Sequence, residues 1–257
     1  MKELTKLLSR VRQAAGRYGM IEAGDRIAVG LSGGKDSAAL LYTLAAMRRF
    51  YPVPYEVLGI SVDPGFPGAE DLFGPVARFC GDLGVEYRVV RTEIYSIVFE
   101  ARREKNPCSL CAKMRRGALA GEVLEAGGNK LALGHHLDDA AETFMMSLML
   151  DGHIGSFSPV TVYEDRGLAV IRPLIYCREH EIRSLVRAAE LPVLESPCPM
   201  DGNTARAEMK EWLRSFDREH RGLYERLTGA MERGGIDGWR TEKSGRASES
   251  GAESGEA

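Results

Sequence analysis

The sequence predicts an α/β protein with a doubly wound, mostly parallel sheet, an N-terminal helix and a small helical C-terminal region. Apolar, strand-like segments alternate with helical segments over most of the chain, as in βαβ units. A glycine-rich turn joins the first of these strands to the next helix, and polar residues follow the ends of other strands. Ligands of such sheets bind beyond the carboxyl ends of the strands, so one active site is expected there.

The order of the elements follows from the spacing of apolar residues. Leucines and a valine recur at helical spacing in residues 3–18, which predicts an amphipathic helix. Strands are then expected at 26–31, 55–62, 85–91 and 130–134, and helices at 36–50, 69–83, 112–127 and 137–150. From about residue 179 to 233 the pattern predicts further helices, separated by a loop around 192–203.

These elements divide the chain into consecutive parts. An N-terminal amphipathic helix (1–20) precedes an α/β domain (21–176), and a helical region (177–235) follows. The last part, 236–257, is rich in Ser, Gly, Glu and Ala from residue 241 onwards and has no large apolar residue there. Because such a composition cannot bury a core, we expect a disordered tail.

The turn Ser32-Gly33-Gly34-Lys35-Asp36-Ser37 is the most informative stretch of the chain. Its glycines let the backbone approach a phosphate, and the N–H groups at the start of the next helix favour negative charge. Lys35 adds a full positive charge. The spacing is not the Gly-x-x-x-x-Gly-Lys of the Walker loop, so the turn predicts an anion site of another kind.

A cysteine pair indicates a second chemical centre. Cys108 and Cys111 form a C-x-x-C at the start of a helix, beside Lys113, Arg115 and Arg116. These surroundings are expected to lower the pKa of the thiols and to favour metal ligation or nucleophilic sulfur chemistry. The pair alone leaves a zinc half-site, a redox pair and an iron–sulfur half-site open.

Cys198 is the candidate third ligand, because it lies between two prolines in a stiff, non-helical loop. Three cysteines suit a [4Fe–4S] cluster in which one iron lacks a protein ligand, since clusters are normally held by four thiolates. Such an open iron parallels catalytic metal sites that keep one position for substrate. Cys80 and Cys177 are interpreted as buried structural residues.

Composition argues against a membrane protein and gives little support for a nucleic-acid partner. The 257 residues carry a formal net charge of −3, and no apolar run approaches the roughly 20 residues of a membrane span. The N-terminus lacks a signal-peptide core, so we expect a cytoplasmic protein with reduced thiols. Basic residues nevertheless cluster on both sides of the cysteine pair and in the N-terminal helix.

Taken together, the motifs resemble those of the PP-loop ATP pyrophosphatases and, within them, the tRNA 2-thiocytidine synthetases, a family of iron–sulfur-dependent tRNA thiolases. The matching segments are residues 32–37, 108–117, 133–139 and 171–174 with Cys198, in the family's order. Related 2-thiouridine synthetases usually carry extra zinc-binding cysteine pairs, which this sequence lacks. One departure is Cys198-Pro199-Met200-Asp201, where the family commonly has a second C-x-x-C.

The resemblance also assigns residues to roles, on an adenine nucleotide alpha-hydrolase-like fold. The implied phosphate-binding residues are Ser32, Gly33, Gly34, Lys35, Asp36 and Ser37, and those near the nucleotide are Asp63, Gly134 and His135. The implied catalytic residues are Lys35, Arg115, Asp138 and Asp139, with His136 in the same segment, and the implied cluster ligands are Cys108, Cys111 and Cys198. A carboxylate can hold Mg²⁺ between phosphates. Asp138 and Asp139 also have a structural interpretation, as acids at a helix N-terminus.

The implied reaction is thiolation of a cytidine in the tRNA anticodon loop. ATP adenylates O2 of the base with loss of pyrophosphate, and sulfur from the cluster then displaces AMP to leave 2-thiocytidine. The implied partners are tRNA and a sulfur donor, either a cysteine desulfurase persulfide or sulfide, and many relatives form a homodimer. The target base must be flipped or lie in a loop, because bases stacked in a helix are inaccessible.

Other interpretations of the same motifs stay open. Cys108 and Cys111 could relay persulfide sulfur without a cluster. The phosphate turn is also found in enzymes that make 2-thiouridine or lysidine in tRNA, although lysidine synthesis does not need the three cysteines. The acidic net charge fits an enzyme that acts on a small molecule. A redox- or nucleotide-sensing binding module is the non-enzymatic alternative.

Overall fold

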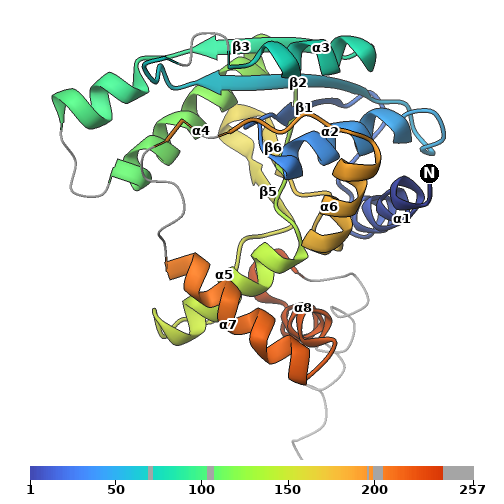
Figure 1. Ribbon diagram of the computed structural model, residues 1–257. Helices are drawn as coiled ribbons and strands as arrows, with labels where there is room; N and C mark the ends of the chain where they lie inside the picture. Colours follow the sequence, from blue (N-terminus) through green and yellow to red (C-terminus); the bar gives the residue numbers. More distant parts are fainter. Residues whose placement is uncertain (69–71, 103–106, 196, 199–204, 240–257) are drawn as a thin grey trace, which may run out of the picture.

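A six-stranded sheet forms the centre of the computed structural model, which describes residues 1–68, 72–102, 107–195, 197–198 and 205–239 (Figure 1). The strands lie in the order β3-β2-β1-β4-β6-β5. Their bounds are β1 Arg26–Gly30, β2 Glu56–Asp63, β3 Glu86–Arg91, β4 Lys130–Ala132, β5 Val160–Tyr163 and β6 Leu168–Ile171. Neighbouring strands are parallel except β5 and β6, so the predicted mostly parallel α/β fold is confirmed.

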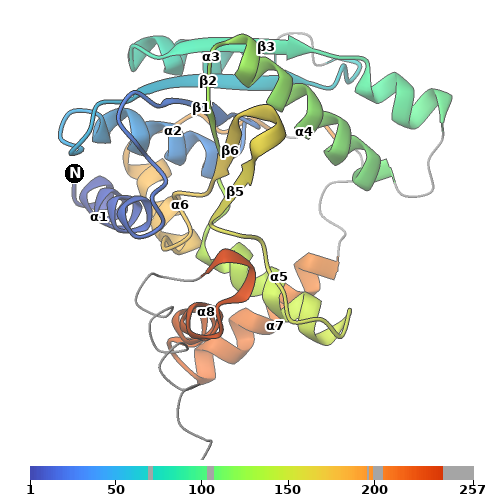
Figure 2. The same ribbon diagram turned by 180° about the vertical axis from the view of Figure 1, so that it is seen from behind.

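Helices cover both faces of the sheet, as a doubly wound arrangement requires. Helices α2 (Lys35–Met47) and α3 (Gly74–Asp82) share one apolar cluster, and α4 (Pro107–Glu125) lies on the opposite face (Figure 2). Side chains alternate along β1, so Ile27 belongs to the first cluster and Ala28 to the cluster beneath α4. Both faces of the central strands are therefore buried.

Two further helices pack outside α2. Helix α1 (Lys2–Arg17) buries Leu7 and Val11, at the helical spacing that predicted it. Helix α6 (Glu179–Ala188), although far from α1 and α2 in the sequence, packs against both of them (Figure 1). Its first turn lies beside the start of α2, where Glu179 pairs with Lys35. The first helix of the predicted helical C-terminal region therefore packs on the main body.

The remaining helices form a layer beyond one edge of the main body. Helix α5 (Leu137–Met149) packs against α7 (Ala205–Glu219) and α8 (Leu223–Gly234), and the three share a small apolar cluster (Figure 1). A π-helical segment (Ser96–Ala101) and short 3-10 turns at Glu164–Arg166 and Ile236–Gly238 complete the secondary structure of the described residues. None of their helices combines the length and the apolarity that crossing a bilayer requires.

Several boundaries differ from the sequence prediction. Helix α4 starts at Pro107 rather than at residue 112, because proline is favoured in the first turn of a helix. Helix α3 starts at Gly74 rather than at residue 69, with a proline in its first turn, and residues 69–71 lie outside the described residues. The sequence analysis also missed strands β5 and β6, whose four-residue lengths leave too short a pattern to read.

The predicted tail begins four residues too early. Ile236–Gly238 forms a 3-10 turn and Trp239 is fully buried, with its Nε1–H donating to the carbonyl of Phe157 at 2.9 Å. A buried tryptophan outweighs the small and polar residues that follow it. Residues 240–257, the rest of the predicted tail, lie outside the described residues.

Candidate active site

The carboxyl ends of three adjacent parallel strands carry the predicted site segments. Strands β2, β1 and β4 are neighbours, and they end at Asp63, at the turn from Ser32 and just before Gly134 respectively. Parallel neighbours end at the same edge of a sheet, so the sequence-distant motifs meet there. The predicted convergence on one edge is confirmed by the sheet order.

The turn Ser32–Ser37 is held by its own hydrogen bonds. The Gly34 N–H donates to Ser32 Oγ at 3.3 Å, and Ser37 Oγ donates to the Gly34 carbonyl at 2.9 Å. Gly33 adopts a φ of +84°, which L side chains rarely adopt. No side chain caps the start of α2. The first amides of this helix are therefore available to an anion.

Lys35 lies within an ion-pair network at this turn. Its Nζ is 2.9 Å from Asp36 Oδ2 and 3.1 Å from Glu179 Oε1 at the start of α6. Burial alone would lower the pKa of Lys35, but Asp36 and Glu179 outweigh burial and raise the pKa above its ordinary value. The lysine is therefore a fixed positive charge beside the phosphate turn.

Gly134 and His135 lie directly against that turn. A Cβ at Gly134 would approach the backbone of Asp36 and Ser37 to 3.1 Å, so the close approach that requires glycine is to the start of α2. The His135 ring lies 4.9 Å from the Phe157 ring, centroid to centroid, and its buried Nδ1 has no hydrogen-bond partner. Burial, with a further contribution from Arg172, lowers the pKa of His135 to about 4. The imidazole is neutral at physiological pH.

Asp138 and Asp139, which follow His136, make hydrogen bonds at the N-termini of two helices. Asp139 Oδ2 accepts from the His136 N–H at 2.9 Å, and the Asp139 N–H donates to His136 Nδ1 at 3.3 Å, which forms a capping box on α5. The buried Asp138 carboxylate accepts from the Glu179 N–H at 2.8 Å and from Arg178 Nε at 3.2 Å. Asp138 therefore contacts the start of α6, a later helix than the one whose first turn it occupies.

Arg115 reaches the site from the opposite face of the sheet. A cavity of about 230 Å³ lies between the ends of the central strands and α4, and its lining includes Ser32, Ile60, Leu133, Arg115 and Arg116. Ser32 of the phosphate turn and Arg115, one of the implied catalytic residues, thus line one cavity. Asp63 does not line it: its Oδ1 accepts from the Gly65 N–H at 2.9 Å, and it borders a neighbouring cavity with Tyr87 and Arg91.

The cysteine pair opens α4 one turn before Arg115. Cys108 is exposed, Cys111 and Cys198 are half-buried, and none of the three forms a disulfide within the described residues. Burial raises the pKa of Cys111, Arg115 opposes this, and Cys198 and Cys108 raise it further. The lowered pKa predicted for this thiol is thus wrong for the metal-free protein, because burial and the neighbouring sulfurs outweigh the arginine. The electrostatic influence of Cys108 and Cys198 on Cys111 indicates that the three sulfurs lie near one another.

Whether these sulfurs fit a metal cluster depends on the donor set. Two cysteines of α4 and one from the segment before α7 supply three sulfur ligands, and Cys108 and Cys198 both act electrostatically on Cys111, which suits a cluster with one open iron. Residues 1–68, 72–102, 107–195, 197–198 and 205–239 bring no three His, Cys, Asp or Glu side chains to metal-binding separation. The three cysteines therefore fit a cluster in the type of ligand they supply and in lying near one another.

A backbone contact explains how Cys198 reaches this edge. The Leu194 N–H donates to the Gly33 carbonyl at 2.9 Å. A Cβ at Gly33 would lie 2.8 Å from Leu194 Cδ1, so the leucine packs directly on the phosphate turn. The segment that leads to Cys198 is thus anchored to the loop that is predicted to bind the phosphates of ATP. No sequence motif pointed to Leu194 in this role.

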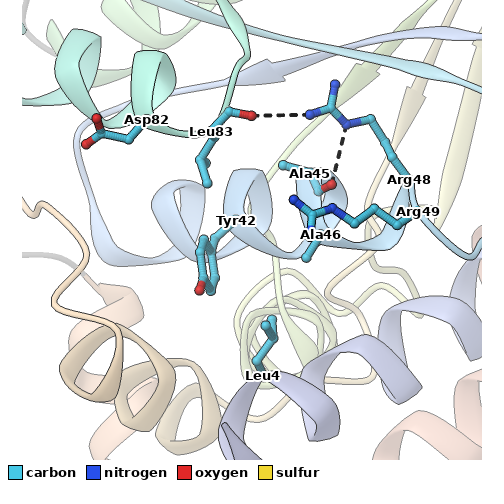
Figure 3. Close-up of a pocket in the computed structure, with 8 residues that line it drawn as sticks. All are labelled: Leu4, Tyr42, Ala45, Ala46, Arg48, Arg49, Asp82 and Leu83. Atoms are coloured by element: carbon cyan, nitrogen blue, oxygen red, sulfur yellow. Dashed lines mark hydrogen bonds between the residues drawn. The ribbon is translucent and has the colours of Figure 1, made fainter.

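Figure 3 shows a separate hollow of about 590 Å³ at the other end of α2. Its lining comes from α1, from the end of α2 and from the end of α3, with Leu4, Tyr42, Arg48 and Leu83 among the residues drawn. Arg48 is engaged there with the Leu83 carbonyl at 3.4 Å. None of the predicted site residues lines this hollow, so it is not part of the candidate active site.

The sequence analysis missed the contribution of α7. Arg206, Lys210 and Arg214 recur every fourth residue along this helix and face α5 and α6. The spacing was readable as one basic stripe, but only the fold shows that the stripe faces the site rather than solvent. Glu179, with which two of these residues pair, carried no sequence signal.

Comparison with known proteins identifies the family. Residues 3–215 match the PP-loop domain family. The tRNA-cytidine(32) 2-sulfurtransferase of Ralstonia pickettii is 39% identical over 234 residues, which cover 88% of this chain and 72% of that protein. The protein of the same name from Dechloromonas aromatica is 37% identical over 240 residues, which cover 90% of this chain and 81% of that protein.

A solved structure agrees with these relatives. The U34-tRNA thiolase NcsA from Methanococcus maripaludis, solved with its [4Fe-4S] cluster, matches with a TM-score of 0.75 at 28% identity. The match covers 88% of this chain and 76% of that chain. The family resemblance is therefore confirmed over most of the sequence: the chain belongs to the PP-loop family and, within it, to the tRNA-cytidine(32) 2-sulfurtransferases.

Proposed function

We propose that this protein is an ATP-dependent tRNA sulfurtransferase that converts a cytidine of the anticodon loop, position 32 in the relatives' name, to 2-thiocytidine. One observation carries the proposal: Ser32 at the start of the phosphate turn and Arg115 line the same cavity, and a C-x-x-C opens α4 one turn before Arg115. An adenylating site and a sulfur site on the same edge can act on one base in succession. The acidic net charge is compatible with this, because the basic residues are clustered beside the cavity.

The first half of the reaction uses the turn Ser32–Ser37. ATP transfers AMP to O2 of the cytidine, and the bond between the α and β phosphates breaks to release pyrophosphate. The amides at the start of α2 and the charged Lys35 stabilise the negative charge that grows on the leaving group. The Mg²⁺ that accompanies ATP would be held by Asp36, whose buried Oδ1 has no hydrogen-bond partner.

The second half replaces the activated oxygen by sulfur. Cys108, Cys111 and Cys198 would hold a [4Fe–4S] cluster, which supplies an open iron site for the incoming sulfur when it is bound. Hydrosulfide sulfur forms the new bond to C2, and the C2–O bond to AMP breaks with its electron pair. Arg115 follows Cys111 by one turn of α4, lines the cavity with Ser32 and is suited to hold the target nucleotide through its base or phosphate. The neutral His135 adds no positive charge.

The decisive test of the function is chemical analysis of tRNA. Nucleosides from a strain without this gene are separated by liquid chromatography and identified by mass spectrometry. We expect 2-thiocytidine to disappear and to return when the gene is restored. Unchanged 2-thiocytidine, or loss of 2-thiouridine or lysidine instead, would contradict the proposal and favour one of the other substrates.

Cys198→Ala tests the role of the cysteines. We expect the purified variant to lose its brown colour, its iron and its thiolation activity while ATP binding is kept, because the phosphate turn does not need this thiol. Iron and sulfide analysis after anaerobic purification measures the cluster, and isothermal titration measures ATP binding. Cys80→Ala is the matched control, since Cys80 is a buried core thiol whose pKa burial raises to about 12.

The outcome separates the sulfur mechanisms. A colourless Cys198→Ala protein that still thiolates tRNA would eliminate the cluster and favour a persulfide relay through Cys108 and Cys111. The sulfur source, a cysteine desulfurase persulfide or sulfide, is tested by supplying each one to the reconstituted reaction. A homodimer and a cytoplasmic location stay predictions, which light scattering and cell fractionation measure.

A further inference from the structure

Four basic side chains converge on one buried carboxylate beside the phosphate turn. Glu179 Oε1 lies 3.1 Å from Lys35 Nζ and 2.8 Å from Arg183 Nη2. Its other oxygen lies 2.9 Å from Lys210 Nζ and 2.7 Å from Arg214 Nη2. The Glu179 side chain is 5% exposed, so these cations surround it almost completely. Burial would raise the pKa of Glu179, but Lys210 and Lys35 hold it well below its usual range.

This arrangement contains more positive than negative charge. Asp36 is the other carboxylate paired with Lys35, at 2.9 Å, so the local set is four cations and two anions. One ion pair would suffice to fix Glu179, and additional cations at a single carboxylate repel one another. Lys35 and Lys210 are both 26% exposed, so a bound anion can reach them.

The basic residues of α7 lie on one stripe. Arg206 Nη1 is 3.7 Å from Asp139 Oδ1 on α5, and Lys210 and Arg214 follow it one and two turns later at Glu179. Met209 and Leu213 are buried on another face of the helix, which fixes the direction of the stripe. The stripe thus runs along the site from Asp139, in the segment 133–139, to the Glu179 carboxylate beside Lys35.

We propose that the pyrophosphate site extends beyond the turn Ser32–Ser37 onto α7, where Lys210 and Arg214 bind the β and γ phosphates of ATP, and then the departing pyrophosphate, together with Lys35. This inference rests on the proposed function, because it assigns more of the same adenylating site. In the absence of ligand, Glu179 pairs with these three cations and competes with the phosphates for them. The multiply charged pyrophosphate supplies the negative charge that this group of basic side chains lacks.

The test measures equilibrium binding of magnesium pyrophosphate, ATP and AMP to the full-length, cluster-loaded protein. In Lys210→Met and in Arg214→Met, we expect pyrophosphate affinity to fall about tenfold or more, since a hydrogen bond to a charged group is lost. AMP affinity should stay within about twofold, because AMP lacks the β and γ phosphates. Lys210→Arg should restore most of the pyrophosphate affinity.

Arg183→Met is the matched control. Arg183 pairs with the same carboxylate but from within α6, four residues along the helix, and we expect it to leave pyrophosphate affinity unchanged. Equal losses for pyrophosphate and AMP in Lys210→Met, or an equal pyrophosphate loss in Arg183→Met, would overturn the proposal and leave the network a purely structural one. Unchanged pyrophosphate affinity in both α7 variants would overturn it as well.

A second variant keeps the inference testable if Lys210→Met does not fold. Glu179→Gln removes the resident negative charge and leaves every cation, so pyrophosphate affinity should rise several-fold; a fall would contradict the proposal. The binding assay contains no tRNA. Selective pyrophosphate losses in a protein that makes no 2-thiocytidine would therefore refute the proposed function and leave the pyrophosphate site standing.

Discussion

The environment of Glu142 disfavours a charged side chain. It lies on α5, is 1% exposed, and its Oε1 has no hydrogen-bond partner. Burial raises the pKa of its carboxyl to about 7, and the charge of Asp139 adds to this, while Lys210 and Arg206 oppose it. The folded protein therefore holds a proton that an unfolded glutamate would release at the same pH.

Stability should consequently fall as pH rises through this range. Below the unfolded-state pKa near 4.5, Glu142 is protonated in both states and does not affect the free energy of unfolding. As pH rises from there to the folded-state pKa of about 7, the protein is progressively destabilised. The accumulated cost is on the order of 3 kcal/mol. Glu142→Gln should therefore stabilise the protein at pH 8 and change little at pH 4.5.

Urea unfolding of both proteins at these two pH values measures the difference. The exposed Glu125→Gln is the matched control on another helix. A Glu142→Gln protein whose free energy of unfolding follows that of the wild type at both pH values would refute the protonated-carboxyl interpretation.

At the scale of elements, Gly33 couples the phosphate turn to the cysteine segment. Its φ of +84° disfavours any side chain, and an added Cβ would lie 3.1 Å from the Cβ of Leu194. Gly33→Ala should therefore displace Leu194 and the segment leading to Cys198. We expect both weaker ATP binding and a lower iron content, although no cysteine is changed.

Gly117→Ala provides the contrast for this prediction. Gly117 lies inside α4 with no neighbouring atom within 4 Å of an added Cβ, so alanine should stabilise the protein by up to about 1 kcal/mol. Iron analysis and ATP titration of both variants give the comparison. A Gly33→Ala protein with a full cluster would show that the turn and Cys198 are independent.

Long elements with a clear period were predictable, whereas short or tertiary features were not. The helix from Lys2 and the strand from Arg26 followed from apolar spacing, and the sheet order confirmed that the motifs share one edge. Strands β5 and β6 carry four residues each and pair only with one another and with β4, so their register depends on the fold.

The candidate site shows the same division. The phosphate turn carries its own backbone geometry, so Ser32–Ser37 could be assigned from sequence. Glu179 could not, because its role arises only when α6 brings it to Lys35 and α7 brings Lys210. Asp138 was interpreted in two ways from the sequence, and its hydrogen bonds to the start of α6 are a structural contact that the sequence did not predict.

On the scale of the whole molecule, one aromatic cluster ties the end of the described chain to its start. Trp239 meets the Tyr18 ring edge-on at 6.2 Å between centroids, and Tyr18 and Tyr176 both donate hydrogen bonds to Glu232 of α8. This cluster joins α1, the segment before α6 and the helical layer. The layer that carries the basic stripe of α7 is thus attached to the main body at more than one point.

Trp239→Ala should therefore destabilise the whole fold. Loss of a fully buried tryptophan and of its hydrogen bond to Phe157 should lower the free energy of unfolding by about 3–5 kcal/mol, and Trp239→Phe by less, since it keeps most of the packing. Trp212→Ala is the internal control, because Trp212 is 44% exposed and its removal should cost about 0.5 kcal/mol or less. Urea unfolding measures all three variants. Equal effects of the two alanine substitutions would mean that Trp239 does not hold the layers together.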